Sequence, residues 1–334
     1  MVLSSPETVW RSSDKELLAL LNSNKLVPKP RKVCFYAPSF TYYKTKTYKS
    51  SLNSFPTVSV TGTGCSLNCK HCGSKVLQTM RAASTPERLL AIAAEIKQDG
   101  AQGFLASGGC LPDGSVPLKP FIPALKSIKR ELGLTVFVHT GIVDTLTAKA
   151  LEDAGIDAAL IDVIGSNETI KRIYNLNVTT QDYHNSLEAL GNAGLALVPH
   201  VVVGLQFGKL EGEFQALEMV AASKPAALVI IALMPISGTA MAKVKPPKPI
   251  DIARVVASAR LMFPHLPLVL GCMRPKGKHR ALADVLALKA GADALAFPSD
   301  EAVTYAQTHK YEISFSQYCC AQIYRDAASR SHSK

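Results

Sequence analysis

An alternation of short apolar runs with amphipathic stretches constrains the fold of this chain more than any other feature. From Thr57 onward, β-branched or apolar runs of strand length alternate with stretches whose apolar residues recur at helical spacing. This alternation is typical of consecutive βα units, whose strands pair in parallel. Eight strands are predicted, at 57–61, 102–107, 135–139, 157–162, 196–203, 226–233, 267–271 and 292–297. Helices are predicted at 85–99, 118–131, 144–153, 180–193, 210–222, 250–262, 279–289 and 299–308.

Eight βα units predict an α/β fold in which residues 56–309 close into a full (β/α)8 barrel. Residues 1–55 are expected to form an N-terminal extension with a short helix after Ser13, and residues 310–334 a C-terminal extension. A chain of 334 residues fits one such barrel with extensions. Active sites of these barrels lie at the carboxyl ends of the strands, so residues that follow each strand are the candidate site residues.

Composition and charge limit the classes of function. The first residues lack the basic and apolar regions of a signal peptide, and the longest apolar run, 226–236, is shorter than the roughly 18 residues of a membrane span. Eight cysteines fit a reducing compartment. We therefore expect a cytoplasmic protein with no membrane partner. The formal charge of +11 indicates an acidic partner, either nucleic acid or an acidic protein.

A basic run rich in aromatic residues lies between Lys29 and Lys49. Three interpretations are open. Interleaved bases and rings can stack on and neutralise nucleic acid, the run can lie along the barrel, or it can form a docking surface for an acidic protein. We favour a segment along the barrel and do not expect nucleic acid as a partner.

Three cysteines occur on one short loop after the first predicted strand, as Cys65-x3-Cys69-x2-Cys72. Three thiolates can hold three corners of a four-iron cluster and leave the fourth iron open for chemistry. The alternative is a structural zinc site, which needs four ligands and usually uses two separated C-x2-C pairs. No second pair with that spacing follows in the sequence, so the cluster is the favoured interpretation.

This C-x3-C-x2-C motif resembles the signature of the radical S-adenosylmethionine (radical SAM) enzymes. The resemblance implies a 4Fe-4S cluster on the three cysteines, with S-adenosylmethionine on its open iron. One electron from a reductase or ferredoxin then splits the sulfonium and gives a 5′-deoxyadenosyl radical, which removes a hydrogen from the substrate. His71 stands where the family usually has an aromatic residue, and we expect it to contact the cofactor.

The second predicted strand ends in Ser107-Gly108-Gly109-Cys110. This resembles the Gly-Gly-Glu of the family, in which glycine backbone meets the amino group of the bound methionine moiety. The resemblance therefore implies cofactor contacts for the first three residues. Cys110 replaces the usual Glu, and it is either a small residue in a tight turn or a ligand that faces the site.

Polar or backbone groups at four further strand ends are candidate cofactor contacts. Asp162 can accept the hydroxyls of a ribose, or it can be a helix cap or part of a loop ion pair. His139 is either functional or a core histidine. The stretches around Gly204 and Met234-Pro235 resemble biotin synthase and a related hydrogenase maturase, and this implies that their backbone meets the adenine.

The seventh predicted strand ends in a basic stretch that contains Arg274, Lys278 and Arg280. Cations at the start of a helix oppose its macrodipole. We favour an anionic ligand or an acidic partner near them, and Arg274 is the predicted cofactor contact. The alternative is a basic turn that is merely solvated.

Four cysteines outside the loop are a tentative ligand set for a second 4Fe-4S cluster: Cys110, Cys272, Cys319 and Cys320. The first two follow predicted strands, and the adjacent pair lies in the C-terminal extension, which can fold across the mouth of the barrel. The alternative is that each is a small buried hydrophobic residue. Cys34 was not assigned to the set.

Together these stretches resemble the biotin-synthase-like proteins that include the subunits of two-component lipoyl synthases. The resemblance implies sulfur insertion into an octanoyl chain on an acidic lipoyl carrier protein or domain, with a second radical SAM subunit. Two other functions stay open. One is a different radical SAM reaction, such as an isomerisation, a biotin-type ring closure or cofactor maturation, and the other is an iron–sulfur protein for electron transfer.

Overall fold

The computed structural model describes residues 5–27, 31–38, 43, 44, 46, 48 and 54–331. Within them, eleven strands form one sheet in which neighbouring strands pair in parallel. The strands are β1 Lys32–Tyr36, β2 Thr57–Ser59, β3 Arg81–Ala82, β4 Gly103–Ser107, β5 Thr135–His139, β6 Ala158–Val163, β7 Leu197–Val203, β8 Leu228–Ala232, β9 Leu268–Leu270, β10 Ala294–Ala296 and β11 Glu312–Ser316. All eight strands predicted from the apolar runs are present, as β2 and β4 to β10.

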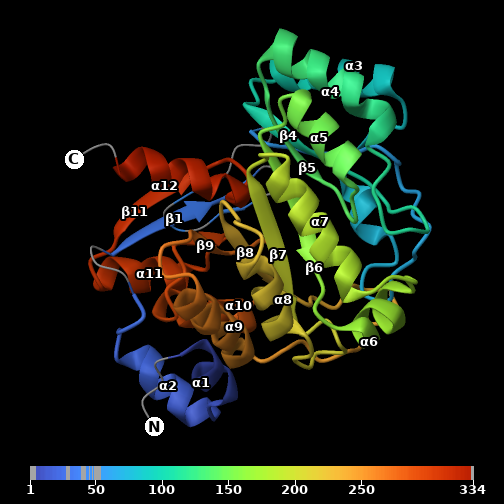
Figure 1. Ribbon diagram of the computed structural model, residues 1–334. Coiled ribbons are helices and arrows are strands. Elements are labelled where there is room, and N and C mark those ends of the chain that lie inside the picture. The colour runs from blue at the N-terminus through green and yellow to red at the C-terminus, as the bar shows by residue number, and fades with distance from the viewer. Residues whose placement is uncertain are drawn as a thin grey trace.

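The sheet curls into a half-barrel, so the prediction of a fully closed (β/α)8 barrel was wrong (Figure 1). Its strand order is β11-β1-β10-β9-β8-β7-β6-β5-β4-β2-β3. Closure would require β2 to pair with β10. Both strands are already paired on both sides, β2 with β3 and β4, and β10 with β1 and β9. The segments before β2 and after β11 are in contact, because the Ser54 hydroxyl donates to the Gln317 carbonyl oxygen at 2.8 Å and the ring of Phe55 lies 6.5 Å from that of Tyr318.

Strand β1 occupies the edge of β10 because its sequence suits a strand that is covered on both faces. Its residues 33–36 are at most 1% exposed, and a parallel strand buried on both faces reads as a continuous apolar run. The basic and aromatic run therefore contributes a strand to the sheet. Of its other rings, Tyr48 stacks on Phe315 at 4.6 Å and the Tyr43 hydroxyl donates to the Pro298 carbonyl. Lys29, Phe40, Tyr42 and Lys49 lie outside the described residues.

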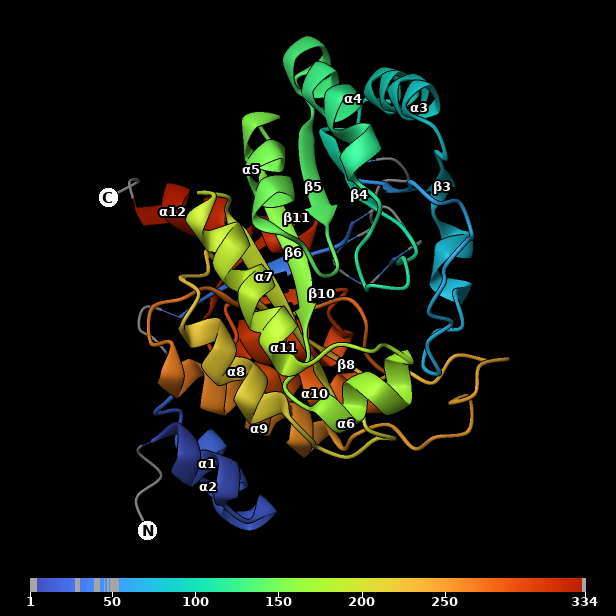
Figure 2. The same cartoon turned by 45° about the vertical axis from the view of Figure 1, so that its right-hand side comes forward.

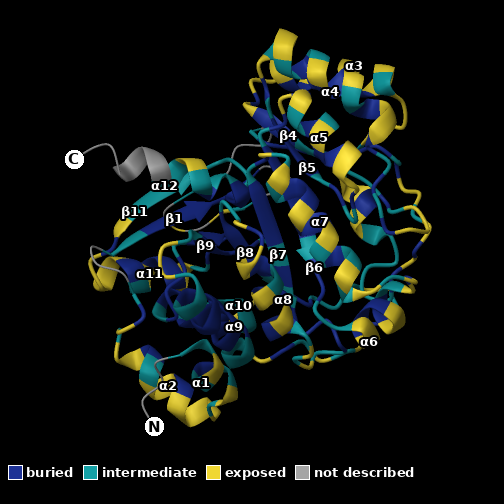
Figure 3. Cartoon of the chain, in the orientation of Figure 1, coloured by how far each residue is buried: buried dark blue, intermediate teal, exposed yellow. Residues whose placement is uncertain are grey.

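Two buried clusters lie on the two faces of the sheet. Alternate residues of one strand belong to different clusters, as the period of a strand requires: Phe137 lies in the interior cluster, and Val136 and Val138 lie in the outer one. The outer cluster is covered by helices, and exposed residues lie mainly on the far side of those helices (Figure 3). The interior cluster is lined by residues such as Val198 and Val229, which face the concave side.

The eight predicted helical segments are present on the outer face, with small shifts at their ends (Figures 1 and 2). They are α3 Pro86–Gln98, α4 Ile122–Ser127 flanked by η2 Lys119–Phe121 and η3 Ile128–Leu132, α5 Thr145–Asp153, α7 Thr180–Asn192, α8 Glu213–Ala221, α9 Pro249–Met262, α10 Lys278–Lys289 and α11 Asp300–Thr308. Shorter elements are α1 Pro6–Arg11, α2 Asp14–Asn22, η1 Lys75–Thr79, α6 Asn167–Thr169, η4 Ile170–Tyr174, η5 Cys320–Gln322 and α12 Ile323–Ser331.

The N-terminal helices α1 and α2 are fixed to α9 by one buried cation. Arg254, which is 6% exposed, donates to the carbonyl oxygens of Val9, Trp10 and Ser12 and pairs with Asp14 at 2.8 Å. The helix expected after Ser13 is α2, and the Ser13 hydroxyl caps it by accepting from the Glu16 backbone N–H. None of the described helices has the length and apolar character that crossing a membrane requires.

Candidate functional site

The cysteine loop follows β2, at the edge of the sheet where the carboxyl ends of the parallel strands meet. It turns back on itself at its second half, where the N–H groups of Cys72 and Gly73 both donate to the Cys69 carbonyl oxygen, at 3.2 and 2.8 Å. Its first half is held from the next strand, because the Ser66 N–H donates to the Cys110 carbonyl oxygen at 2.9 Å. Backbone hydrogen bonds therefore fix the loop before any metal is bound.

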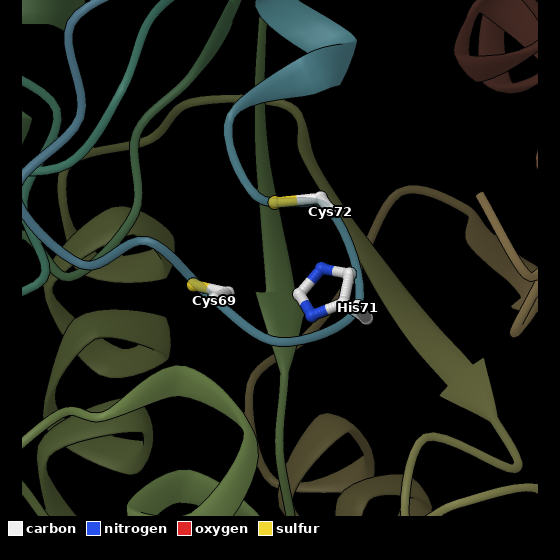
Figure 4. Close-up of side chains that lie close together, drawn as sticks. All are labelled: Cys69, His71 and Cys72. Carbon is white, nitrogen blue, oxygen red and sulfur yellow. The ribbon is translucent and has the colours of Figure 1, made fainter. Parts of the chain in front are cut away.

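The side chains of Cys69, His71 and Cys72 lie close together on the loop (Figure 4). Their ligand atoms lie within 4.8 Å of one another. The hydrogen bond from Cys69 and the neighbouring His71 lower the pKa of Cys72 to about 4, although burial opposes the shift. The same hydrogen bond, with burial, raises the pKa of Cys69. The hydrogen bond therefore favours the thiolate form of Cys72, and thiolate is the form that binds a metal.

The donor set of this loop fits an iron–sulfur cluster. Cys65 is placed against Gly109, and it is close enough to Cys69 and Cys110 for its charge to raise the pKa of both thiols. Three soft sulfur ligands on one loop match the thiolate ligation of such clusters. A zinc ion on Cys69, Cys72 and His71 is the alternative that these atoms alone would allow.

Two glycines after β4 are packed against the cysteine loop. A Cβ on Gly109 would lie 2.0 Å from the Gly64 carbonyl oxygen and 2.5 Å from the Cys65 Cβ, and its N–H donates to the Thr61 hydroxyl at 2.7 Å. A Cβ on Gly108 would be 3.1 Å from side-chain atoms of Thr61 and Val60. Gly109 is therefore required for the loop to approach the end of β4, whereas Gly108 has more room.

We expect Gly109→Ala to displace the cysteine loop and Gly108→Ala to leave it in place. After anaerobic reconstitution, the Gly109 variant should lose iron and cleave S-adenosylmethionine roughly 100-fold more slowly, because a misplacement of about 1 Å costs that much in rate. The Gly108 variant is the matched control. Equal iron content and equal cleavage in the two variants would contradict this assignment.

Three polar side chains from β5, β6 and β7 gather at one place: His139 and Asp162 near the ends of β5 and β6, and His200 in the middle of β7. The ligand atoms of His139, Asp162 and His200 lie within 4.8 Å of one another, and His139 Nε2 is 3.4 Å from Asp162 Oδ1. Burial alone would raise the pKa of Asp162, but the charge of His139 and its hydrogen bond to the carboxylate outweigh burial and hold that pKa below its ordinary value. Asp162 is therefore an anion that faces the same edge as the cysteine loop.

His200 was not singled out from the sequence. Burial lowers its pKa to about 4, so the ring is neutral at physiological pH. Its Nδ1 lies 3.1 Å from the Val198 carbonyl oxygen, and a neutral ring that donates there leaves Nε2 as an acceptor. A carboxylate and a neutral imidazole together can accept hydrogen bonds from ribose hydroxyls or from a polar substrate. Side chains alternate between the two faces of a strand, so His200 lies on the opposite face from Val201. This alternation is the sequence signal that could have singled out His200.

Gly204, Met234 and Pro235 follow β7 and β8, as predicted. Gly204 has φ +74°, and a Cβ there would lie 2.7 Å from Pro247. Its N–H donates to Glu213 Oε1 at 2.7 Å. Glu213 is 4% exposed, and its second carboxylate oxygen has no hydrogen-bond partner among the described residues. The Glu213 carboxyl group positions the backbone that is predicted to meet the adenine. No sequence motif pointed to this residue.

Glu213 predicts a pH dependence of stability. Burial raises its pKa from 4.5 to about 7. Because the folded state holds this proton more tightly, stability is lost as the pH rises from the pKa of Glu213 in the unfolded state to its pKa in the folded state. The loss is about 3 kcal/mol above pH 7. Glu213→Gln keeps an acceptor for the Gly204 N–H and cannot ionise, so its melting temperature relative to wild type should rise between pH 5 and pH 8. Glu218→Gln, on the exposed face of α8, is the control, and a parallel pH profile for all three proteins would refute this role.

Arg274 and Cys110 lie in different surroundings, although both follow strands of the sheet. Arg274 is fully buried, pairs with Asp284 at 2.8 Å, and donates to the carbonyl oxygens of Gly271 and Phe297. Its donors are directed at the protein, which gives it a structural role near the end of β9. Cys110 lies beside the cysteine loop, where its carbonyl oxygen accepts from the Ser66 N–H. Burial and then the charge of Cys65 raise the pKa of its thiol to about 12.

Cys272, Cys319 and Cys320 form a separate group at the interior cluster. Burial, and then the charge of Cys319, raises the pKa of Cys272 to about 11, and Cys320 is close to both. Cys34, on β1, is buried in the same interior cluster. Within the described residues, the structure thus brings three of the four cysteines of the tentative second set near one another, and Cys34, which had been left out, belongs to the same interior cluster.

Comparisons with known proteins agree with the cysteine loop. Residues 59–208 match the model of the radical SAM superfamily. The biotin synthase of Zymomonas mobilis subsp. mobilis is 30% identical over 261 residues, which cover 74% of this chain and 73% of that protein. The chain belongs to the radical SAM superfamily. This membership implies a 4Fe-4S cluster and S-adenosylmethionine, and it decides between the cluster and zinc on the cysteine loop.

A second biotin synthase and two solved structures are also similar to this chain. The biotin synthase of Prochlorococcus marinus (strain MIT 9515) is 29% identical over 271 residues, 77% of this chain and 76% of that protein. The crystal structure of HydG, a maturase of the FeFe-hydrogenase, has a TM-score of 0.65 at 16% identity and covers 97% of this chain and 74% of its own. Methylornithine synthase (PylB) has a TM-score of 0.58 at 15% identity, with 92% and 97% covered. These two structures support the fold alone.

Proposed function

We propose that this radical SAM enzyme inserts sulfur into an octanoyl chain on an acidic carrier protein, as one subunit of a two-component lipoyl synthase. The observation that carries the proposal is the second group of thiols, Cys272, Cys319 and Cys320. These thiols follow β9 and β11, whose carboxyl ends lie at the same edge of the sheet as the cysteine loop. A sulfur-inserting enzyme needs a sulfur source near the substrate radical as well as the centre that generates the radical.

The residues of the chain divide between two tasks. Cys65, Cys69 and Cys72 would hold the 4Fe-4S cluster, which when bound with S-adenosylmethionine supplies the radical that removes a hydrogen. Asp162 and the neutral His200 would hold the cofactor by accepting hydrogen bonds from its hydroxyls. Loop backbone at Gly204, fixed by Glu213, and at Met234-Pro235 would border the adenine.

The second group of thiols would hold an additional iron–sulfur cluster as the sulfur donor. Three thiols, Cys272, Cys319 and Cys320, come from two segments, and the fourth ligand would be either Cys110, as expected from the sequence, or Cys34. Cys34 lies in the same interior cluster as Cys320, whereas Cys110 contacts the cysteine loop. The ligands of a four-iron cluster sit on separate iron atoms, so they spread more widely than the ligands of one ion. The apolar side chains of the interior cluster suit an alkyl substrate better than a charged one.

A second candidate function is a different radical SAM reaction on a small polar substrate. His139, Asp162 and His200 favour it, because three polar groups at one point can orient a compound with several hydrogen-bonding groups. Methylornithine synthase and the hydrogenase maturase share the fold with this chain. In this alternative the second group of thiols would have no role in sulfur transfer.

The direct test is incubation of the reconstituted enzyme with an octanoylated carrier protein, S-adenosylmethionine and dithionite, alone and with a second radical SAM subunit. We expect a carrier whose mass has increased by the replacement of hydrogen with sulfur. Cleavage of S-adenosylmethionine without any change in the carrier under both conditions would refute sulfur insertion. Turnover of a small polar substrate would instead support the second candidate.

A further inference from the structure

We propose that an exposed basic patch beside the cysteine loop docks an acidic protein that delivers one electron to the cluster site. The proposal rests on membership of the radical SAM superfamily and on the loop, and it does not depend on sulfur insertion. The patch consists of Lys70, Arg172, Lys209, Lys243 and Lys245, and we call it the basic patch. Four of the five are exposed, and Lys70 is half-buried.

Backbone hydrogen bonds bring three of its segments together around Lys70. The Lys70 N–H donates to the Ile173 carbonyl oxygen at 2.9 Å, which joins the cysteine loop to η4. The Met241 N–H donates to the Lys70 carbonyl oxygen at 3.2 Å, which joins the loop to the turn after β8. That turn and the segment that carries the cysteine loop approach each other on the right of Figure 2. The segments that carry Lys70, Arg172, Lys243 and Lys245 are therefore held together by backbone hydrogen bonds.

Phe207, from the loop after β7, lies at the centre of this surface. Lys70 Nζ is 6.0 Å and Arg172 Cζ is 5.3 Å from the centroid of its ring. The neighbouring Gly208 is so close to the turn after β8 that a Cβ there would lie 2.0 Å from the Lys245 carbonyl oxygen. The backbone at Lys209 and Lys245 thus adjoins the Phe207 loop, and the patch has an aromatic residue at its centre, a type enriched at protein interfaces.

The charge of this surface is not balanced within the described part of the chain. Arg172 pairs with Glu168 at 3.2 Å, but within the described residues none of the four lysines of the patch forms an ion pair. Glu211, at the margin, accepts a hydrogen bond from the Ser166 hydroxyl at 2.9 Å. Like charges held together by backbone contacts repel one another, and an acidic partner would relieve that repulsion. Complementary charge of this kind mainly accelerates association.

The position of the patch selects an electron donor among acidic partners. Lys70 lies between Cys69 and His71, so a protein seated on Lys70 and Phe207 is separated from the cysteine thiols only by the loop itself. Reductive cleavage of S-adenosylmethionine consumes one electron, which an external donor has to supply. A donor bound here would place its redox group close to the loop. A carrier protein has no need of this position, because its substrate must enter at the strand ends.

The experiment compares two triple variants with the same change of charge. The patch variant is Lys209→Glu/Lys243→Glu/Lys245→Glu, and the control is Lys15→Glu/Lys97→Glu/Lys126→Glu, whose lysines are exposed on α2, α3 and α4. Neither variant alters the cysteine loop. The first measurement is the affinity of each protein for oxidised flavodoxin, an acidic electron carrier, between low and high salt. The second is cleavage of S-adenosylmethionine with reduced flavodoxin and, separately, with dithionite.

We expect the patch variant to bind flavodoxin about tenfold more weakly at low salt and to lose about the same factor in the flavodoxin-dependent rate. The control should change less than about twofold, and dithionite should support the wild-type rate in both variants. Equal loss in both variants, or none in the patch variant, would overturn the proposal. So would a loss that persists with dithionite, or an unchanged flavodoxin rate with impaired turnover of a carrier protein. Because no substrate is needed, failure of sulfur insertion would leave the test unaffected.

Discussion

Replacement of Cys69 by alanine should abolish reductive cleavage of S-adenosylmethionine. Cys69 is 5% exposed, and its sulfur donates toward the Tyr174 carbonyl oxygen at 3.7 Å and pairs with Cys72. Its loss leaves two thiolates on the loop, too few for a cluster that keeps one iron free for the cofactor. We expect the formation of methionine and 5′-deoxyadenosine with dithionite to fall at least about 1,000-fold, because the electron that splits the sulfonium has no other route. Cys65→Ala and Cys72→Ala should behave in the same way.

Ser66→Ala is the matched control for these variants. Ser66 is exposed on the same loop. Its hydrogen bond to the Cys110 carbonyl oxygen is made by its backbone N–H, which the substitution keeps. This variant should retain iron and wild-type cleavage. If the three cysteine variants retained wild-type turnover, the assignment of the loop as the radical-generating centre would have to be abandoned. If Ser66→Ala were equally inactive, the loop would be sensitive to any change, and the cysteine variants would carry no information about ligation.

The second large effect concerns Cys319 and Cys320. If the interior thiols hold a second four-iron cluster, the reconstituted wild type should contain about eight irons per chain and the Cys319→Ala/Cys320→Ala variant about four. The variant should still cleave S-adenosylmethionine, because the cysteine loop is built from other segments. It should fail to transfer sulfur to an octanoylated carrier, because transfer needs a sulfide in contact with the substrate radical. Iron analysis, cofactor cleavage and the mass of the carrier check the three statements.

Single variants decide which cysteine is the fourth ligand. Cys34→Ala should disturb the second cluster if Cys34 completes the interior set, and Cys110→Ala should do so if the expectation from the sequence holds. Both should be made with Cys65, Cys69 and Cys72 replaced by alanine, so that the iron measured belongs to the second site alone. About four irons in wild type, unchanged in the double variant Cys319→Ala/Cys320→Ala, would remove the second cluster and with it the main support for sulfur insertion.

Much of the sheet could be predicted from the sequence because its information is local. A strand buried on both faces needs an unbroken apolar run, and a helix on the outer face needs apolar residues at helical spacing, so eight strands and eight helical segments were visible in the pattern. The spacing of Cys65, Cys69 and Cys72 is equally local, since three ligands on one loop require no distant partner. Because parallel strands end at one edge of the sheet, the residues that follow them could be predicted to lie at the same edge as the cysteine loop.

Contacts between distant segments were decided by the tertiary structure. The residues 33–36 are as apolar as any strand, but only the free edge of β10 determined that β1 pairs there and prevents closure of the barrel. Arg274 looked like a free cation until burial paired it with Asp284, 10 residues later on α10. Glu213 lies outside every motif, and the fold brings it to the Gly204 N–H. The sequence by itself determined the elements and the cysteine loop, because these depend on the period and spacing of neighbouring residues. Which thiols, carboxylates and cations meet was determined only by the packed chain, because burial and charge pairing depend on residues far apart in sequence.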